Sequence, residues 1–147
     1  MAKIAFLFSG QGAQRPGMVR SLYEELAGSR AVFDRVSEAT GRDMTALCFS
    51  ACQEDLNQTV NAQLAMFTAD LAAHGALLEM GVKPDYCAGF SLGEYAALVA
   101  SGVLGLAEAA RLVQKRGEIM SQHQSGSMAA VIGLPSEEVE RLCAQVK

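Results

Sequence analysis

The sequence predicts an α/β fold in which helices flank a parallel sheet. Short apolar runs at residues 4–8 and 86–88 each lead into a turn that contains glycine and serine, as buried parallel strands do. The segments between and after them carry apolar residues at helical spacing, and a third apolar run spans residues 128–133. Helices that alternate with apolar strands indicate a parallel sheet covered by helices.

Helices are expected directly after the first strand. Pro16 suits the first turn of a helix, and Gly28 is expected to end that helix. Ser29 is expected to cap a second helix, which Gly41 ends. Residues 43–58 are expected to form a short helix and an irregular linker.

The second half of the chain contains the longest helical pattern. Glycines mark two helix ends, at Gly81 and Gly102. A polar break at residues 124–127 is the one candidate boundary between subdomains. The expected elements are a helix over 60–80, a strand over 85–88, helices over 94–100 and 106–122, a strand over 128–133 and a helix that Ser136 caps.

Composition and charge indicate an intracellular globular protein, which we expect in the cytoplasm. Half of the 147 residues are hydrophobic and 19% are charged, so a core can form. The net charge of −4, without a run of Lys and Arg, argues against nucleic acid as a partner. The N-terminal apolar run is too short for a signal peptide, and we expect no segment to span a membrane.

The four cysteines are scattered along the chain. Only Cys48 and Cys52 are close in sequence, and neither a second pair nor a nearby histidine accompanies them. A zinc site is therefore not expected. We expect Cys48, Cys52, Cys87 and Cys143 to be reduced, buried thiols, and we expect no bound metal.

The segment Gly89-Phe90-Ser91-Leu92-Gly93 places a serine between two glycines, after an apolar strand and before a helix. On such a sharp strand-to-helix turn the hydroxyl is exposed, and the first backbone N–H groups of the helix face the reacting carbonyl. Glycine is required on both sides because a β-carbon would crowd the turn or the substrate. Ser91 is therefore a candidate nucleophile. The alternative is a tight turn whose serine merely caps the helix.

A serine nucleophile needs a base, and the chain contains two histidines, His74 and His123. His74 lies on the long helix among apolar residues, which is typical of a partly buried structural histidine. His123 lies in a polar segment at a helix end, where an exposed residue is expected. The residues themselves thus offer a nucleophile without a convincing base.

The segment Gly10-Gln11-Gly12-Ala13-Gln14 follows the first strand but does not match a phosphate-binding loop. Arg15 stands where a dinucleotide fingerprint needs glycine, and the Gly-Lys-Ser/Thr of a P-loop is absent. A loop at the carboxyl end of a parallel strand lies where α/β proteins bind ligands. Backbone N–H groups of this loop and of Leu92 would then form an oxyanion hole. A flexible turn between strand and helix explains the spacing equally well.

Arg111, Lys115 and Arg116 share one helix with Glu108 and Glu118. A solvated charged face explains most of these residues. One arginine turned inward would instead bind a carboxylate through two parallel hydrogen bonds, which the ammonium group of lysine does not provide.

Four motifs, in this order, resemble the malonyl-CoA:acyl-carrier-protein transacylases of fatty acid synthesis and the acyltransferase domains of polyketide synthases. The similarity covers essentially the whole chain. The motifs are Phe8-Ser9-Gly10-Gln11-Gly12-Ala13-Gln14, Gly89-Phe90-Ser91-Leu92-Gly93-Glu94-Tyr95, Lys115-Arg116-Gly117 and Gly126-Ser127-Met128-Ala129-Ala130-Val131-Ile132-Gly133-Leu134.

The resemblance implies an acyltransferase that moves malonyl from malonyl-CoA to the phosphopantetheine thiol of acyl carrier protein. It implies that Ser91 is acylated and that the backbone N–H groups of Gln11 and Leu92 form the oxyanion hole. Arg116 would bind the free carboxylate of malonate, and Gln63 matches a family glutamine near the acyl pocket. Malonyl-CoA is a substrate here, and the resemblance implies no cofactor.

The sequence departs from this family at two points. Phe90 stands where many members have histidine, and its side chain can neither donate nor accept a hydrogen bond. Family proteins are also considerably longer, and their catalytic histidine lies downstream of a small ferredoxin-like subdomain. The resemblance therefore implies a partial α/β-hydrolase-like large subdomain over residues 1–125 and the beginning of the small subdomain over 126–147. Neither histidine of the chain matches the family's base.

Two other functions remain open. An α/β-hydrolase esterase would share the serine turn, but it gains nothing from Arg116 or from the loop at Gln11. A truncated or split fragment would bind partners without turnover, or would need a C-terminal complementing segment that supplies the histidine. An unfinished strand–helix unit before Lys147 and a thin sheet of three expected strands favour missing elements.

Overall fold

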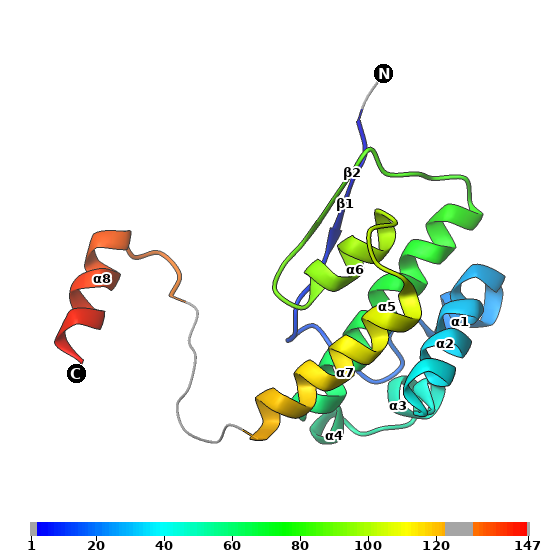
Figure 1. Ribbon diagram of the computed structural model, residues 1–147, viewed down its shortest axis with the longest axis horizontal. Coiled ribbons are helices and arrows are strands. Elements are labelled where there is room, and N and C mark those ends of the chain that lie inside the picture. Colours follow the sequence, from blue (N-terminus) through cyan, green and yellow to red (C-terminus); the bar gives the residue numbers. More distant parts are fainter. Residues whose placement is uncertain (1–2, 123–130, 147) are drawn as a thin grey trace.

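The computed structural model describes residues 3–122 and 131–146 of the chain. This described part contains two strands and eight helices (Figure 1). The elements are β1 (Ala5–Phe8), α1 (Arg20–Glu25), α2 (Ala27–Thr40), α3 (Met44–Phe49), α4 (Gln53–Asn57), α5 (Thr59–Glu79), β2 (Tyr86–Gly89), α6 (Gly93–Ala100), α7 (Leu106–Gln122) and α8 (Ser136–Gln145).

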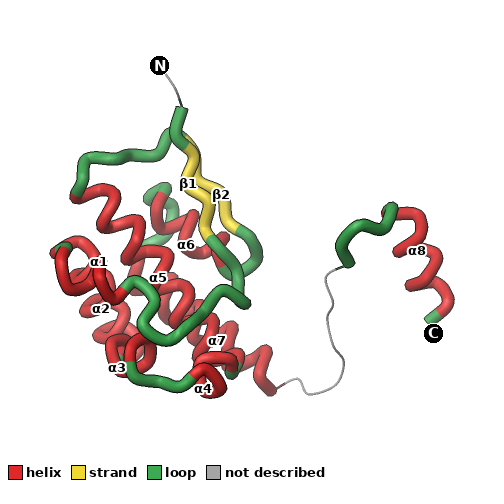
Figure 2. Tube along the Cα trace, turned by 180° about the vertical axis from the view of Figure 1, so that it is seen from behind, coloured by secondary structure: helices red, strands yellow, loops and turns green. Residues whose placement is uncertain are grey.

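β1 and β2 form a parallel pair, which Figure 2 shows side by side. Phe8 lies opposite Gly89, so the two strands end at the same edge of the sheet. At the opposite edge Lys3 forms an exposed ion pair of 2.8 Å with Asp85. The parallel register therefore brings the loop after β1 next to the turn after β2.

The long helix α5 lies at the centre of the helical layer, with α2 and α7 packed against it (Figure 1). Residues 62–69 of α5 are all buried, because this helix is apolar on nearly every side. The helices α2 and α5 cross closely at two glycines. A β-carbon on Gly28 would lie 2.7 Å from the carbonyl oxygen of Gly75.

Of the four helix ends predicted at glycines, three are confirmed; the prediction for Gly28 is wrong, because Gly28 lies inside α2, where the close approach of Gly75 requires it. Gly41, Gly81 and Gly102 follow α2, α5 and α6, and their φ angles are 68°, 82° and 76°. This left-handed conformation suits glycine and ends a helix without steric cost. The long helix and α7 also fall within one residue of the predicted bounds.

Two predicted helix caps are wrong. Ser29 lies inside α2, where its buried hydroxyl donates a 2.7 Å hydrogen bond to the carbonyl of Ala72. The helix begins earlier because Leu26 is already extended, with φ −117° and ψ 128°. At the last helix Pro135 occupies the cap position and Ser136 is the first helical residue.

The first strand is less buried than the sequence predicts. Phe6 and Phe8 face the helices, but Leu7 is 80% exposed and Tyr86 on the neighbouring strand is 62% exposed. Within the described residues, helices thus cover only one face of this pair of strands. An apolar run predicts burial, but it does not say whether both faces are covered.

The third predicted strand is not seen. Residues 131–133 form no strand, and residues 128–130 lie outside the described part of the chain, as does the predicted boundary near residue 125. The last helix, α8, carries Glu137 and Glu138 in its first turn as expected, and none of its residues is buried. Among the described helices, none combines the length and the apolar character that crossing a bilayer requires.

Candidate active site

Ser91 occupies the sharp turn between β2 and α6. Its φ angle is 52°, in the left-handed region that a residue with a side chain rarely adopts. Such a conformation costs on the order of 1–3 kcal/mol and persists only where the surrounding structure enforces it. The residue is exposed to solvent. The structure therefore contains the strained strand-to-helix turn that presents a serine hydroxyl.

The glycines on either side of Ser91 are required by close backbone contacts. A β-carbon on Gly89 would overlap the carbonyl group of Gly93. A β-carbon on Gly93 would overlap the carbonyl oxygen of Phe8, at the end of β1. The predicted need for glycine at both positions is confirmed, and the second contact also presses the serine turn against the first strand.

Arg116 on α7 reaches the hydroxyl of Ser91. Its Nη2 donates a 3.1 Å hydrogen bond to the Oγ of Ser91, and its Nη1 donates a 2.7 Å hydrogen bond to the Oε1 of Gln63. Gln63 on α5 is fully buried, and its Nε2 donates to the Sδ of Met120 at 3.2 Å. A buried amide thus binds the guanidinium of Arg116, and this positively charged group lies within hydrogen-bond distance of the candidate nucleophile.

The other basic residues of α7 point to solvent. Arg111 and Lys115 are exposed, and Lys115 forms a 3.4 Å ion pair with Glu118. The prediction of a solvated charged face holds for them, whereas Arg116 is the arginine that turns inward. Gly117, the residue after Arg116, allows this approach. A β-carbon there would lie 3.1 Å from the Cα of Val60 on α5.

The loop after β1 lies against the serine turn. A β-carbon on the buried Gly10 would be 2.8 Å from the Cδ1 of Phe90, a residue that is 75% exposed. Gln11 lies in the exposed part of this loop, and Leu92 is buried directly before α6. The first N–H groups of a helix have no partners within it. The structure brings the two predicted segments together, and their part in an oxyanion hole stays a prediction.

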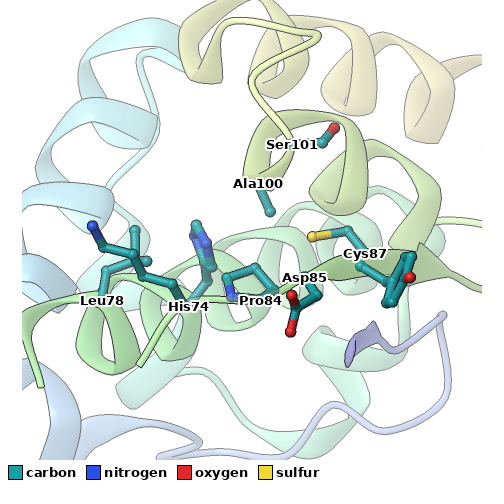
Figure 3. A pocket seen from close by; sticks show the side chains of 9 residues that line it. His74, Leu78, Pro84, Asp85, Cys87, Ala100 and Ser101 are labelled. Atoms are coloured by element: carbon teal, nitrogen blue, oxygen red, sulfur yellow. The ribbon is translucent and has the colours of Figure 1, made fainter. Parts of the chain in front are cut away.

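His74 faces a different part of the molecule. Its ring packs edge-on against Phe6 and Phe8, with centroids 5.8 and 6.0 Å apart, and burial lowers the pKa of the imidazole. It lines a cavity of about 400 Å³ between α5, the start of β2 and the end of α6, where Asp85 also contributes (Figure 3). Ser91 does not line this cavity.

The described residues supply Ser91 with no base. Within them no imidazole or carboxylate forms a hydrogen bond with the Ser91 hydroxyl, whose partner is the cationic Arg116. His123 lies outside the described residues. In the described part of the chain the structure thus shows a candidate nucleophile beside a guanidinium, but no proton acceptor in contact with its hydroxyl.

Asp70 is a residue of this region that the sequence analysis does not single out. Its Oδ1 accepts a 2.9 Å hydrogen bond from the hydroxyl of Ser9, directly after β1. Burial raises the pKa of Asp70 to about 6, although hydrogen bonds from Ser9 act in the opposite direction. A signal was present, because Asp70 is the only Asp, Glu, Lys or Arg between residues 59 and 78 of a largely apolar helix.

The cysteines do not form a metal site in the described part of the chain, where no group of three or more His, Cys, Asp and Glu side chains lies close enough to hold an ion. All four cysteines are free thiols. Cys48 is buried, which raises the pKa of its thiol to about 12. The expectation of buried thiols is wrong for Cys52 and Cys143, which are exposed.

Comparison with known proteins shows similarity along nearly the whole chain. A family model described as acyl transferase domain matches residues 5–146. The malonyl CoA-acyl carrier protein transacylase of Bacillus subtilis (strain 168) is 41% identical over 149 aligned positions, which cover 99% of this chain and 47% of the relative.

Solved structures show the same similarity. The crystal structure of FabD from Acinetobacter baumannii superposes with a TM-score of 0.89 at 42% identity, over 98% of this chain and 46% of that one. A malonyl-transacylase in complex with its type II PKS acyl-carrier protein gives 0.88 at 36% identity, over 99% of this chain and 48% of that one. The chain therefore has their α/β fold, and it spans about half the length of the relatives it matches.

Proposed function

Since the chain belongs to the acyl transferase domain family, we propose that it transfers malonyl from malonyl-CoA to the phosphopantetheine thiol of an acyl carrier protein in fatty acid synthesis. The observation that carries the proposal is the contact between Arg116 and Ser91, in which a guanidinium lies 3.1 Å from the candidate nucleophile. The contact places the hydroxyl that would be acylated next to a guanidinium, a group that binds carboxylates well. The proposal includes a cytoplasmic site of action, malonyl-CoA as substrate and no cofactor.

In the first half-reaction the hydroxyl oxygen of Ser91 attacks the thioester carbonyl of malonyl-CoA. A base takes the hydroxyl proton, the carbonyl oxygen becomes an oxyanion, and the backbone N–H groups of Gln11 and Leu92 stabilise it. The carbon–sulfur bond then breaks, and the coenzyme A sulfur leaves with that proton. The product is a malonyl ester on Ser91.

In the second half-reaction the phosphopantetheine thiol gives up its proton to the base and attacks this ester. The carbon–oxygen bond breaks, and Ser91 recovers its proton. The far carboxylate of malonate is separated from the Oγ by two carbon atoms, whereas Arg116 now lies on the Oγ itself. The guanidinium must therefore swing outward when the ester forms, while Gln63, buried beneath it, stays as its second partner.

Selection of malonyl over acetyl follows from the same contact. A carboxylate accepts two parallel hydrogen bonds from a guanidinium, and such charge-assisted pairs are about twice as strong as neutral hydrogen bonds. An acetyl group would leave the half-buried guanidinium of Arg116 without this partner, and an unpaired polar group is costly.

We propose further that the base comes from polypeptide outside residues 1–147. Two observations support this. Among the described residues the hydroxyl of Ser91 forms no hydrogen bond with an imidazole or a carboxylate that could take its proton, and the relatives are about twice as long as this chain. A fragment that binds partners without turnover is the corresponding alternative for the chain by itself. An α/β-hydrolase-type esterase is the other alternative, and it gains nothing from a cation fixed at the serine.

The experiment that tests the proposal mixes the chain with a separately expressed C-terminal half, designed on the B. subtilis relative. Malonyl-CoA is added, and peptide mass spectrometry locates the adduct. We expect malonyl on the peptide that contains Ser91, transfer to acyl carrier protein only in the mixture, and neither in Ser91→Ala. Losing one member of a catalytic triad costs about four to six orders of magnitude in kcat, so the chain alone should be nearly inactive.

Three results would contradict the proposal. Malonyl on another residue, or undiminished transfer by Ser91→Ala, would rule out Ser91 as the nucleophile. Full transfer by the chain alone would show that His74 or His123 supplies the base. Hydrolysis of simple esters at a rate far above transfer to acyl carrier protein would favour the esterase.

A further inference from the structure

The loop after β1 is tied at both ends to helices. At its start the Ser9 hydroxyl donates to the carboxylate of Asp70 on α5 at 2.9 Å. At its end the Gln14 side chain donates to Asn57 at 3.0 Å, and Gln53 donates to the Gln14 carbonyl at 3.1 Å, both partners being on α4. These hydrogen bonds anchor both ends of the loop, and residues 10–13 lie between them.

The part of the loop between these two anchors contacts the serine turn. The Phe90 N–H donates a 3.1 Å hydrogen bond to the Phe8 carbonyl, which fixes the turn to the end of β1. Gly10 then packs beneath the Phe90 ring, so closely that a β-carbon on it would lie 2.8 Å from that ring. Any shift at Ser9 is passed on to Gly10 and Gln11, because they are the next residues along the chain.

Asp70 is an unexpected residue at this place in an apolar helix. Its Oδ2 is buried and has no hydrogen-bond partner in the described part of the protein. Burying an incompletely paired carboxylate costs free energy, and burial raises the pKa of this group to about 6. No basic side chain forms an ion pair with it among the described residues, and Ser9 supplies its hydrogen bonds. Its favourable contact is therefore made with the loop.

We propose that Asp70 is a positioning residue which, through Ser9, holds residues 9–12 against the Ser91 turn. This inference rests on the proposed function, because the Gln11 N–H of this loop is one of the two donors assigned to the oxyanion. Such a donor acts only when it lies about 2.7–3.1 Å from the position that the oxyanion takes. A displacement of about 1 Å in a catalytic arrangement can cost about a hundredfold in rate.

The first test measures the loop itself and needs no activity. Backbone amide hydrogen exchange is followed by NMR in the 147-residue chain at Gly10, which is buried, and at Gly12, whose N–H donates a 2.8 Å hydrogen bond to the Oε1 of Gln14. Asp70→Ala and Ser9→Ala each remove the anchor, and we expect exchange at these amides to become about tenfold faster or more. Asp70→Asn keeps an oxygen acceptor for the serine hydroxyl, so exchange should stay close to that of the unaltered chain.

Ser29→Ala is the matched control for these variants. It also removes a serine hydrogen bond to α5, the buried 2.7 Å contact with the Ala72 carbonyl, but at a place remote in sequence from the loop. We expect it to destabilise the whole fold without selectively speeding exchange at Gly10 and Gly12. A variant that acts only through global stability would behave like this control.

The second test measures malonyl transfer in the mixture with the C-terminal half. If Asp70 positions the loop, Asp70→Ala and Ser9→Ala should lower kcat about tenfold or more and leave KM for malonyl-CoA nearly unchanged, because the oxyanion exists only during the reaction. Asp70→Asn should restore most of kcat.

The outcomes separate this inference from the proposed function. Unchanged loop exchange in both alanine variants would overturn the inference, whatever the rates are. Faster loop exchange with unchanged kcat would overturn the positioning role. If the unaltered mixture transfers no malonyl at all, the proposed function fails, and the exchange measurement alone decides whether Asp70 holds the loop.

Discussion

Replacing Asp70 with asparagine should change how the stability of this chain depends on pH. Burial raises the pKa of Asp70 from 3.8 to about 6 in the folded chain. Between these values the folded chain binds more protons at Asp70 than the unfolded chain does. The free energy of unfolding therefore falls as pH rises through this window, and it stays at the lower level above it.

The size of the effect follows from the same two values. At about 1.4 kcal/mol for each pKa unit, the rise from 3.8 to about 6 corresponds to an upper limit of about 3 kcal/mol. Asp70 keeps some access to solvent, which screens its charge, so we expect about 2 kcal/mol. Asparagine has nearly the same shape, still accepts the Ser9 hydrogen bond and carries no charge at any pH.

His74, one turn along α5, contributes a pH dependence of the opposite sign. Burial lowers the pKa of its imidazole below 6.5 in the folded chain, so the free energy of unfolding rises as pH increases toward 6.5. This contribution is present in both proteins and cancels in their difference. The quantity to compare is therefore the stability of Asp70→Asn relative to the unaltered chain, at each pH.

The assay is urea unfolding followed by far-UV circular dichroism, at several pH values from about 3.5 to about 8. The relative stability of Asp70→Asn should increase by about 2 kcal/mol across this range. Asp43→Asn is the control of opposite sign, because hydrogen bonds from Thr45 and Ala46 lower the pKa of Asp43. Its relative stability should decrease as pH rises. If the stability difference between Asp70→Asn and the unaltered chain does not change with pH, the reasoning is refuted, since ionisation of the Asp70 carboxyl would then not lower the free energy of unfolding.

The remaining predictions concern the proposed acyl site and the serine turn. Arg116→Ala should lower malonyl transfer about 30- to 160-fold, corresponding to a lost charge-assisted pair of about 2–3 kcal/mol, and should affect acetyl transfer far less. Arg111→Ala is the control on the same helix and should be nearly neutral, and equal losses for both acyl groups would make Arg116 structural. Gly93→Ala should destabilise the fold by about 3 kcal/mol, because its β-carbon would overlap the Phe8 carbonyl. Glu94→Ala, an exposed neighbour, should stay within about 0.5 kcal/mol in the same unfolding measurement, and a folded Gly93→Ala of unchanged stability would contradict the overlap.

The features that the sequence predicts well are those fixed by neighbouring residues. The serine turn follows from two glycines around Ser91, because the steric limits of the backbone act over only a few positions. The ends of α2, α5 and α6 follow from single glycines in the left-handed conformation. The long α5 follows from its apolar periodicity and length. Each of these signals lies within one stretch of chain, so it can be read before the chain is folded.

Helix caps and the burial of strand residues are features that such local signals do not determine. Ser29 has the right chemistry for a helix cap, but packing of α2 on α5 buries its hydroxyl against the carbonyl of Ala72 instead. Leu7 belongs to an apolar run that predicts a buried strand, yet 80% of it is exposed, because the described helices cover only the other face. A pattern states what a residue is suited to, and the neighbours that packing brings decide what it contacts.

The arrangement of the site itself is decided by tertiary structure. Arg111, Lys115 and Arg116 are chemically similar on one helix, and only the packing of α7 against α5 turns Arg116 toward Ser91 and Gln63, which lie 25 and 53 positions away in the chain. The contact between Ser9 and Asp70 spans 61 positions. Hydrogen bonds of a few ångströms depend on how helices and strands pack across such separations. Local sterics and periodicity carry no information about those distances, which is why the sequence supplied the chemical groups and folding alone brought them together.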